Sequence, residues 1–325
     1  MNRSHANDDT YEEDAETPSE PSACDNGEYF LARYRRIDPD AVAIDPASVR
    51  QALRVNTTRT TAQVLIEVLS SRGATFERIP WLRNGYFAAA PFSMGATPEY
   101  LLGKYYLQGP LSQLACEILD PSPGARVLDM AAAPGSKTTY LAALVGETGV
   151  VVALDNDASR LAAVRNNVER LGLPNVVCVK KDARFATDMG ENFLFVLLDA
   201  PCSGNFCSDD GWFGSRTIQH VRSNARTQRE LLKAAVGCLA PGGRLLYSTC
   251  SLEPEEDECA ISWALERYPD LDVVPLDRLS LGDGGVTSWD GKELDHRVAG
   301  TRRFWPHKTG CEGFFIALLR RKNED

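Results

Sequence analysis

From residue 126 onward, short apolar runs alternate with segments in which apolar residues recur at helical spacing. The runs near 126–129, 150–154, 176–180, 193–199 and 244–249 predict buried strands, and the segments near 136–145, 158–171, 225–239 and 256–268 predict helices. This alternation predicts an α/β fold with a doubly wound parallel sheet that has helices on both faces. In such sheets the ligand binds beyond the carboxyl ends of the strands.

The first 120 residues follow a different pattern. Residues 1–28 are polar and acidic and predict a disordered tail. Residues 29–55 read as mostly helical, a helix capped by Thr60 or Thr61 follows, and two short strands flank a loop at 83–85. Residues 97–120 read as a connecting helical segment before prolines at 121 and 123. We therefore expect a small N-terminal α+β module with connecting helices over 29–120 and a second domain over 121–325.

Charge is distributed unevenly along the 325 residues. The net charge is −10, of which residues 1–28 carry −8, so the remaining chain is close to neutral and a nucleic-acid partner is not excluded. No run of eighteen apolar residues and no N-terminal apolar signal region is present. We expect a cytoplasmic monomer without a membrane segment.

The nine cysteines are odd in number and include no C-x-x-C pair. Neither a disulfide framework nor a zinc site is expected from these spacings, so we predict no metal. Most of the cysteines are expected to be small buried hydrophobic residues.

The segment VLDMAAAPGSKT at 127–138 predicts a strand, a tight turn of small residues and a helix start. Such a turn lets backbone N–H groups approach a ligand closely. Asp155 ends the next strand, at the spacing where a carboxylate meets the ribose hydroxyls of a nucleoside. Asp182 follows the third strand and either accepts from an adenine amine or caps a helix. The turn matches neither the dinucleotide nor the triphosphate fingerprint, which favours a nucleoside without phosphates.

Two thiols follow two strands of the same sheet edge. DAPCSG places Asp199 and Cys202 after one strand, and STCSLEPEED places Cys250 after another. A thiolate is the nucleophile that suits an electron-poor ring, because addition at carbon 6 of cytosine makes carbon 5 able to accept a methyl group. A second group must then remove the proton at carbon 5, and an acid at ring nitrogen 3 lowers the barrier to addition.

The motifs APGSKT, DAPCSG and YSTCSLEPEED, with the closing RRFWPHKTGCEGFF, resemble the Nop/Sun-type RNA cytosine-5 methyltransferases. The resemblance covers roughly residues 48–320 and implies a Rossmann-like methyltransferase sheet with S-adenosylmethionine as the methyl donor. It implies a donor site formed by Ala131, Ala132, Ala133, Pro134, Gly135, Ser136, Lys137, Asp155, Arg160, Asp182 and Asp199. Ser136 departs from the family, which more often has Gly there, and we expect it to cap the helix.

The resemblance also implies the catalytic roles. Cys250 would be the nucleophile, Cys202 would assist product release, Asp199 would lie against the target base, and Lys137 would line the site. DNA cytosine-5 methyltransferases use a Pro-Cys nucleophile, which would point to Cys202 instead. The residues alone do not show which thiol is the nucleophile. The resemblance favours Cys250, because Cys250 stands in the Thr-Cys motif of the family.

Cationic residues at both ends of the chain are candidates for RNA contact. The set comprises Arg54, Asn56, Arg59, Arg302, His307 and Lys308, with Phe304 and Trp305 available for stacking on bases. The alternatives are solvated surface for the N-terminal residues and an aromatic core with solvated charges for the C-terminal ones.

We therefore expect an RNA cytosine-5 methyltransferase that flips its target base into the crevice. The compact N-terminal module favours tRNA over ribosomal RNA. The same chemistry on ribosomal RNA, a methyltransferase acting on DNA or a small molecule, and a catalytically silent RNA-binding module are the alternatives.

Overall fold

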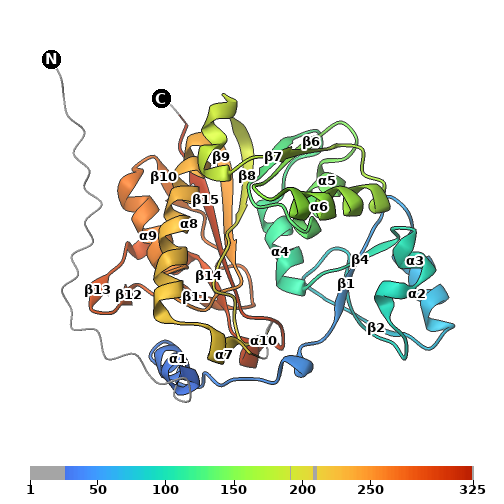
Figure 1. The fold of residues 1–325 in the computed structure, drawn as a ribbon, viewed down its shortest axis with the longest axis horizontal. Coiled ribbons are helices and arrows are strands. Elements are labelled where there is room, and N and C mark those ends of the chain that lie inside the picture. The colour runs from blue at the N-terminus through green and yellow to red at the C-terminus, as the bar shows by residue number, and fades with distance from the viewer. Residues whose placement is uncertain (1–25, 191, 208–210, 324–325) are drawn as a thin grey trace.

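The computed structural model describes residues 26–190, 192–207 and 211–323. Most of the predicted acidic tail therefore lies outside the described residues. Its last three residues, 26–28, belong to the helix α1 (Asn26–Arg35), so the predicted boundary of the tail is wrong there. The α1 side chains Phe30 and Tyr34 pack with Trp212 and Trp305. This helix thus lies against the C-terminal half of the chain, as Figure 1 shows.

The N-terminal module is a four-stranded antiparallel sheet in the order β2-β3-β1-β4. Its strands are β1 (Ala52–Val55), β2 (Thr75–Arg78), β3 (Gly85–Ala89) and β4 (Tyr105–Leu107), and its helices are α2 (Ala62–Ser70) and α3 (Pro98–Leu101). The Thr61 side chain accepts from the Val64 N–H, which confirms one of the two predicted caps.

Two sequence expectations for this region are wrong. Residues 29–55 contain only α1, a short 3₁₀ turn (Pro46–Ser48) and β1, and the predicted connecting helix at 97–120 is interrupted by β4. The apolar residues of β4 pair with β1, about fifty positions earlier, and a strand this short cannot be told from helix by periodicity alone.

The second sheet has the order β11-β14-β15-β9-β8-β5-β6-β7, with β10 paired to β15. Its parallel strands are β5 (Arg126–Asp129), β6 (Val150–Asp155), β7 (Val176–Lys180), β8 (Phe193–Asp199) and β9 (Leu239–Thr249). The C-terminal strands β14 (Arg302–Phe304) and β15 (Phe314–Arg321) extend the sheet, with β15 antiparallel to β9. The short strands of this sheet are β10 (Leu271–Val273) and β11 (Asp283–Gly284), and β12 (Ser288–Trp289) and β13 (Lys292–Glu293) form a separate two-stranded sheet.

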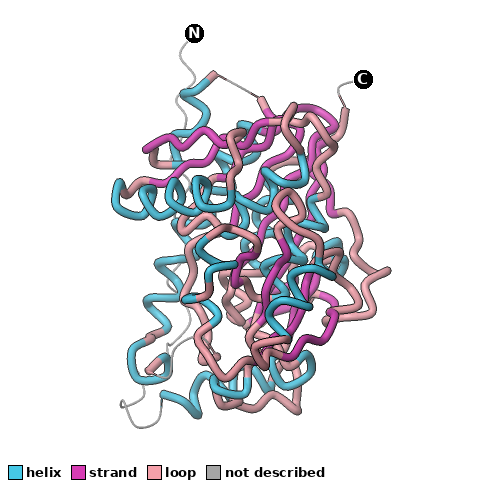
Figure 2. The backbone as a smooth tube through the Cα atoms, turned by 90° about the vertical axis from the view of Figure 1, so that its right-hand side faces the viewer, coloured by secondary structure: helices cyan, strands magenta, loops and turns pink. Residues whose placement is uncertain are grey.

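Helices cover both faces of this sheet, which confirms the predicted doubly wound architecture (Figures 1 and 2). One core cluster joins α4 (Pro110–Leu119) and α5 (Ser136–Val145) to the sheet, with α6 (Ala158–Leu171) beside them. A second core cluster joins α8 (Ile218–Cys238) and α9 (Glu258–Arg267) to the opposite face. The remaining short helices are the 3₁₀ segments η2 (Met94–Ala96), η3 (Ala183–Met189) and η4 (His296–Gly300), and the α-helices α7 (Trp212–Ser215) and α10 (Pro306–Thr309).

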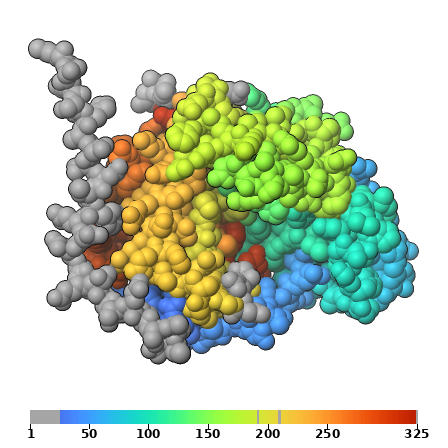
Figure 3. Space-filling view, in the orientation of Figure 1, coloured from blue at the N-terminus to red at the C-terminus, as the bar shows by residue number. Residues whose placement is uncertain are grey.

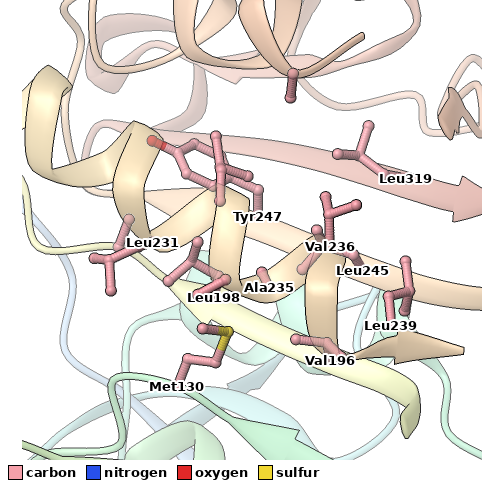
Figure 4. Close-up of a cluster of buried hydrophobic side chains, with 14 of the residues drawn as sticks. Met130, Val196, Leu198, Leu231, Ala235, Val236, Leu239, Leu245, Tyr247 and Leu319 are labelled. Carbon is pink, nitrogen blue, oxygen red and sulfur yellow. The ribbon is translucent and has the colours of Figure 1, made fainter. Parts of the chain in front are cut away.

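Successive residues of each central strand enter different cores, as the pleat requires. Val127 packs in the cluster with α4 and α5, whereas Leu128 packs with α8 and α9. Figure 4 shows the second cluster, in which Val196 and Leu198 of β8 and Leu245 of β9 meet Leu231 and neighbouring residues of α8. The strands are thereby fixed on both faces, so the loops at their carboxyl ends start from rigid positions.

Candidate active site

The polar motifs of the sequence meet at the carboxyl ends of β5, β6, β8 and β9. Strand β8 pairs with β5 on one side and with β9 on the other, with Asp199 opposite Ser248. The loop carrying Cys202 therefore lies directly beside the loop carrying Cys250. Figure 3 shows this face hollowed between the yellow α8 segment and the teal N-terminal segments, with C-terminal chain in red at its base.

The turn between β5 and α5 packs closely against α6 at a glycine. Gly135 has φ of +101°, and a Cβ there would lie 3.2 Å from the Val164 Cα. Gly135 is the N-cap residue, and Ser136 is the first residue of α5. The expectation that Ser136 caps the helix is therefore wrong, and the first N–H groups of α5 have no side-chain cap.

Two predicted site carboxylates, Asp155 and Asp182, accept backbone hydrogen bonds at this edge of the sheet. The Asp155 carboxylate accepts from the Asp157 N–H at 3.0 Å and the Ala133 N–H at 3.4 Å, and Arg160 lies 3.4 Å from it. Asp182 caps the segment η3, where it accepts from the Arg184 N–H, and the Arg184 guanidinium pairs with it at 2.7 Å. The hydrogen bond from Arg184 lowers the pKa of Asp182. Of the two interpretations given for Asp182, the structure contains the helix cap.

Asp129 is a buried acid for which the sequence suggested no role. It is 1% exposed, and its Oδ2 accepts from the Thr138 hydroxyl at 2.7 Å. Its Oδ1 has no hydrogen-bond partner among the described residues. Burial raises the pKa of Asp129 to about 6. The sequence signal that could have identified Asp129 is its position at the end of the apolar run of β5.

Lys137 and Asp199 form an ion pair at this edge of the sheet. The Lys137 Nζ lies 2.6 Å from the Asp199 Oδ2, and the Ser248 hydroxyl donates to the Asp199 Oδ1 at 2.6 Å. Desolvation acts to lower the pKa of the buried Lys137 amine, but the adjacent carboxylate outweighs it and raises that pKa. Lys137 is therefore positively charged and Asp199 is oriented by two donors.

The two thiols are in direct contact. The Cys202 Sγ and the Cys250 Sγ lie 3.1 Å apart, within hydrogen-bonding distance. A hydrogen bond from the Cys202 thiol lowers the pKa of Cys250, whereas the same contact and burial raise the pKa of Cys202 well above its usual value. Cys250 is thus the thiol that ionises first, with Cys202 as its hydrogen-bond donor.

Glu256 connects the two thiol loops, a role that was not expected from the sequence. Its buried carboxylate accepts from the Ser203 N–H at 3.0 Å and from the Ser203 hydroxyl at 2.8 Å. The Ser203 and Ser251 hydroxyls lie 3.3 Å apart, and each serine directly follows one of the thiols. Burial raises the pKa of Glu256, and hydrogen bonds from Ser251 and Ser203 oppose that rise. We call Glu256 with these two serines the Glu256 clamp.

The C-terminal candidates for RNA contact are largely engaged inside the protein. Arg302 is 7% exposed and its Nη2 donates to Asp277 at 3.1 Å. His307 contacts Asp38 at 2.9 Å, and Lys308 pairs with both Asp38 and Asp283. Phe304 and Trp305 are buried at 0% and 2% exposure, so the alternative of an aromatic core is correct and base stacking on them is excluded.

The N-terminal candidates hold the module to the second domain. Arg54 and Asn56 are 4% and 6% exposed, so the expected exposed polar face is wrong for both. Asn56 Nδ2 donates to the backbone oxygens of Gly103 and Leu171, and Arg59 Nε also donates to the Leu171 oxygen. Arg59 remains on the surface.

No helix of the described residues is long and apolar enough to cross a membrane. Within the same described ranges, no group of three or more His, Cys, Asp or Glu side chains is placed to hold a metal ion.

Comparison with known proteins relates both parts of the chain to one group. A family model described as 16S rRNA methyltransferase RsmB/F matches residues 116–320, and one described as the N-terminal domain of 16S rRNA methyltransferase RsmF matches residues 29–110. A solved structure described as a methyltransferase homolog protein from Pyrococcus horikoshii is 36% identical, with a TM-score of 0.79. The alignment covers 93% of this chain and 99% of that one.

Curated relatives are longer than this chain. The 28S rRNA (cytosine-C(5))-methyltransferase of Mus musculus is 34% identical over 91% of this chain and 39% of its own length. The ribosomal RNA small subunit methyltransferase F of Cronobacter sakazakii is 35% identical over 90% of this chain and 63% of its own length. The chain therefore spans less than two thirds of either relative.

Proposed function

Since the chain belongs to the family of RsmB/F-type RNA methyltransferases, we propose that it transfers a methyl group from S-adenosylmethionine to carbon 5 of a cytosine in RNA. The observation that carries the proposal is the 3.1 Å contact between the Cys202 and Cys250 thiols beside the Lys137–Asp199 ion pair. One nucleophile, one group for product release and one acid at the ring are the groups that this chemistry needs.

The residues around the turn fit the donor. The first N–H groups of α5 have no side-chain cap, and they follow Gly135, where the positive φ and the contact with α6 disfavour a Cβ. Asp155 lies at the end of β6, where a ribose would meet it, and the Asp129 Oδ1 is buried without a partner among the described residues. Residues 131–137 with Asp155 would hold S-adenosylmethionine, which supplies an electrophilic methyl group. For Asp182, already paired with Arg184, we propose contact with the adenine through its partly exposed carboxylate.

The chain's own groups would then act in order. The Cys250 thiolate adds to carbon 6 of the flipped cytosine, which places electron density on carbon 5 for methylation. Asp199 lies against the ring, where a proton held between it and nitrogen 3 favours the addition. After methylation Cys202 gives up its own thiol proton to solvent and takes the proton from carbon 5. The electron pair of that C–H bond re-forms the double bond between carbons 5 and 6, and the bond from carbon 6 to Cys250 breaks to return Cys250 as a thiolate. Lys137 keeps Asp199 in place throughout.

Which class of RNA the protein methylates is a separate proposal. The relatives are named for ribosomal RNA, and their names give the expected preference for tRNA no support. We therefore propose ribosomal RNA as the first substrate to assay and tRNA as the second. We place RNA contact on the exposed Arg59 and Lys308, because Arg54, Asn56 and Arg302 are buried.

A covalent trapping assay tests this function. Wild type, Cys250→Ala and Cys202→Ala are each mixed with S-adenosylmethionine and unmodified transcripts of ribosomal RNA or tRNA, then separated on denaturing gels. We expect a slowly migrating adduct only with Cys202→Ala, because product release fails while Cys250 still adds to the base. An adduct only with Cys250→Ala would exchange the two roles. No adduct and no methyl incorporation with any RNA would overturn the RNA proposal.

A further inference from the structure

The N-terminal helix α1 is bonded to the segment that follows β9 and carries Cys250, residues 250–257, which we call the Cys250 loop. Arg33 of α1 is 7% exposed, and its Nη2 donates to the Glu253 Oε2 at 2.8 Å. Glu253 is 0% exposed and stands three residues after Cys250. The Nη2 also contacts Glu255, but that side chain is 18% exposed, so solvent can replace this contact. The buried Glu253 is therefore the acid that depends on Arg33.

The loss of Arg33 would leave Glu253 as a buried acid without its opposite charge, which is a costly arrangement. Burial raises the pKa of Glu253 to about 7, and Arg33 opposes this rise. Without Arg33 the carboxylate would take up a proton or turn toward solvent, and in either case the Cys250 loop would lose its ion pair with α1. Arg303 also holds this loop, because it donates to the Leu252 oxygen at 2.7 Å. We therefore expect the loop to shift rather than to unfold.

The helix α1 also packs on a residue that holds the loop of the other thiol, Cys202. The Phe30 ring meets the Trp212 ring edge to face, with the ring centres 4.8 Å apart. The Trp212 Nε1 donates to the backbone oxygen of Ser203 at 2.8 Å, and Ser203 directly follows Cys202 in the chain. Figure 1 shows α1 beside α7, the short helix that begins at Trp212. One helix near the N-terminus thus contacts the supports of both thiol loops.

We propose that α1 is a positioning element of the active site, in which Arg33 holds the Cys250 loop so that the two thiols stay in contact. The Glu256 clamp joins the two thiol loops directly, whereas α1 holds them from a segment 220 positions away in the chain. Small displacements of a reacting group are costly in rate, so an element that touches no substrate can still matter for catalysis. The proposal rests on the function proposed above, because it concerns the nucleophile of that reaction. The contact between the thiols can nevertheless be measured without methyl transfer.

The pH dependence of Cys250 alkylation reports on the contact between the thiols. The hydrogen bond from Cys202 lowers the pKa of Cys250, so a longer separation should move the acid limb of alkylation to higher pH. Asp199 and Glu256 raise this pKa and Lys137 lowers it. Within the described residues no hydrogen bond or ion pair joins any of these three groups to α1, so a shift caused by α1 reports on the thiol contact. The rate is measured with iodoacetamide on the full chain and assigned by peptide mass analysis.

Arg33→Met is compared with wild type, with Cys202→Ala and with the variant that carries both substitutions. We expect the acid limb of Arg33→Met to lie at higher pH than that of wild type, by no more than the shift in Cys202→Ala. In the Cys202→Ala background the Arg33 substitution should add no further shift, because the contact that it controls is already absent. Single-turnover methyl transfer by Arg33→Met should fall by about tenfold or more, with unchanged affinity for S-adenosylmethionine.

Arg35→Met is the matched control on the same helix, because it also removes a guanidinium, but from a side chain that is 39% exposed and pairs with Glu28. We expect it to keep the acid limb of wild type. Arg33→Lys has a single ammonium in place of the fork, so it should shift the limb in the same direction as Arg33→Met, and it decides if that protein fails to fold.

Three alkylation results would overturn the positioning role of Arg33. They are a wild-type limb in the folded Arg33 variants, an equal shift in Arg35→Met, and a further shift in the Cys202→Ala background. Absence of methyl transfer by wild type with any RNA would count against the proposed function and would leave the alkylation result intact.

Discussion

Glu256 accepts two hydrogen bonds from Ser203, one from its backbone N–H at 3.0 Å and one from its hydroxyl at 2.8 Å. Ser203 follows Cys202 in the chain, and Glu256 follows Cys250 by six residues. The carboxylate therefore fixes the position of one thiol loop relative to the other.

Substitution of Glu256 should slow catalysis without removing a reacting group. In Glu256→Gln one oxygen can no longer accept as a carboxylate, so the thiol loops should lose alignment. We expect single-turnover methyl transfer to fall by about tenfold or more, equivalent to about 1.4 kcal/mol in the barrier. Glu255→Gln is the control, since Glu255 pairs with Arg33 instead. Equal rates for wild type and Glu256→Gln would contradict a positioning role.

The pH dependence of Cys250 should change when Cys202 is removed. The hydrogen bond from Cys202 lowers the pKa of Cys250, so the reactive thiolate persists to lower pH in wild type. In Cys202→Ala that bond is lost, and the acid limb of Cys250 reactivity should move to higher pH. The rate of iodoacetamide alkylation, assigned to Cys250 by peptide mass analysis, measures this shift. An unchanged limb would mean that Cys202 is not the donor.

Asp129 should make the protein less stable as the pH rises. Its folded pKa of about 6 lies above the unfolded value of about 4, so the folded state binds this proton more tightly. The resulting stabilisation is present at low pH and is lost as the pH rises through about 6, a change of order 3 kcal/mol.

Asp129→Asn keeps an acceptor for Thr138 and removes the titration. Urea unfolding at pH 5 and pH 8 should therefore show the variant gaining stability relative to wild type at the higher pH. Comparison at each pH cancels the titration of other groups. A difference between the two proteins that does not vary with pH would refute this assignment.

Gly135→Ala should weaken both the fold and the donor site. A left-handed alanine costs about 1–2 kcal/mol, and the close approach to the Val164 backbone adds to that cost. Gly190→Ala provides the control, because Gly190 also has positive φ but has open space where a Cβ would lie. Chemical denaturation should show a larger loss for the Gly135 variant, and calorimetry should show weaker donor binding only for it.

The local pattern of apolar and polar residues was sufficient to predict the central sheet and the proximity of the two thiols. Parallel strands bring their carboxyl ends to one edge, so Asp199, Cys202 and Cys250 could be placed together from their positions after apolar runs. The C-terminal segment extends this sheet through β14 and β15.

Exposure of charged residues could not be predicted in the same way. The buried Arg54 donates to Thr139, 85 positions later, and the buried Arg302 donates to Asp277, 25 positions earlier. Such partners lie far apart in the chain, and no periodic pattern marks them. The Glu256 clamp was missed for a related reason, because a run of acids after a strand reads equally well as a helix start.

The hydrogen bonds from Asn56 and Arg59 to the Leu171 oxygen tie the N-terminal module to the second domain. Leu171 is the last residue of α6, where backbone oxygens lack donors within the helix. The N-terminal module thus completes the end of a helix that belongs to the methyltransferase sheet. The family model of the N-terminal domain ends at residue 110, and the RsmB/F model begins at residue 116. These hydrogen bonds nevertheless connect the regions that the two models match. The module is thus bonded to the second domain, and its removal would leave the Leu171 oxygen without these donors.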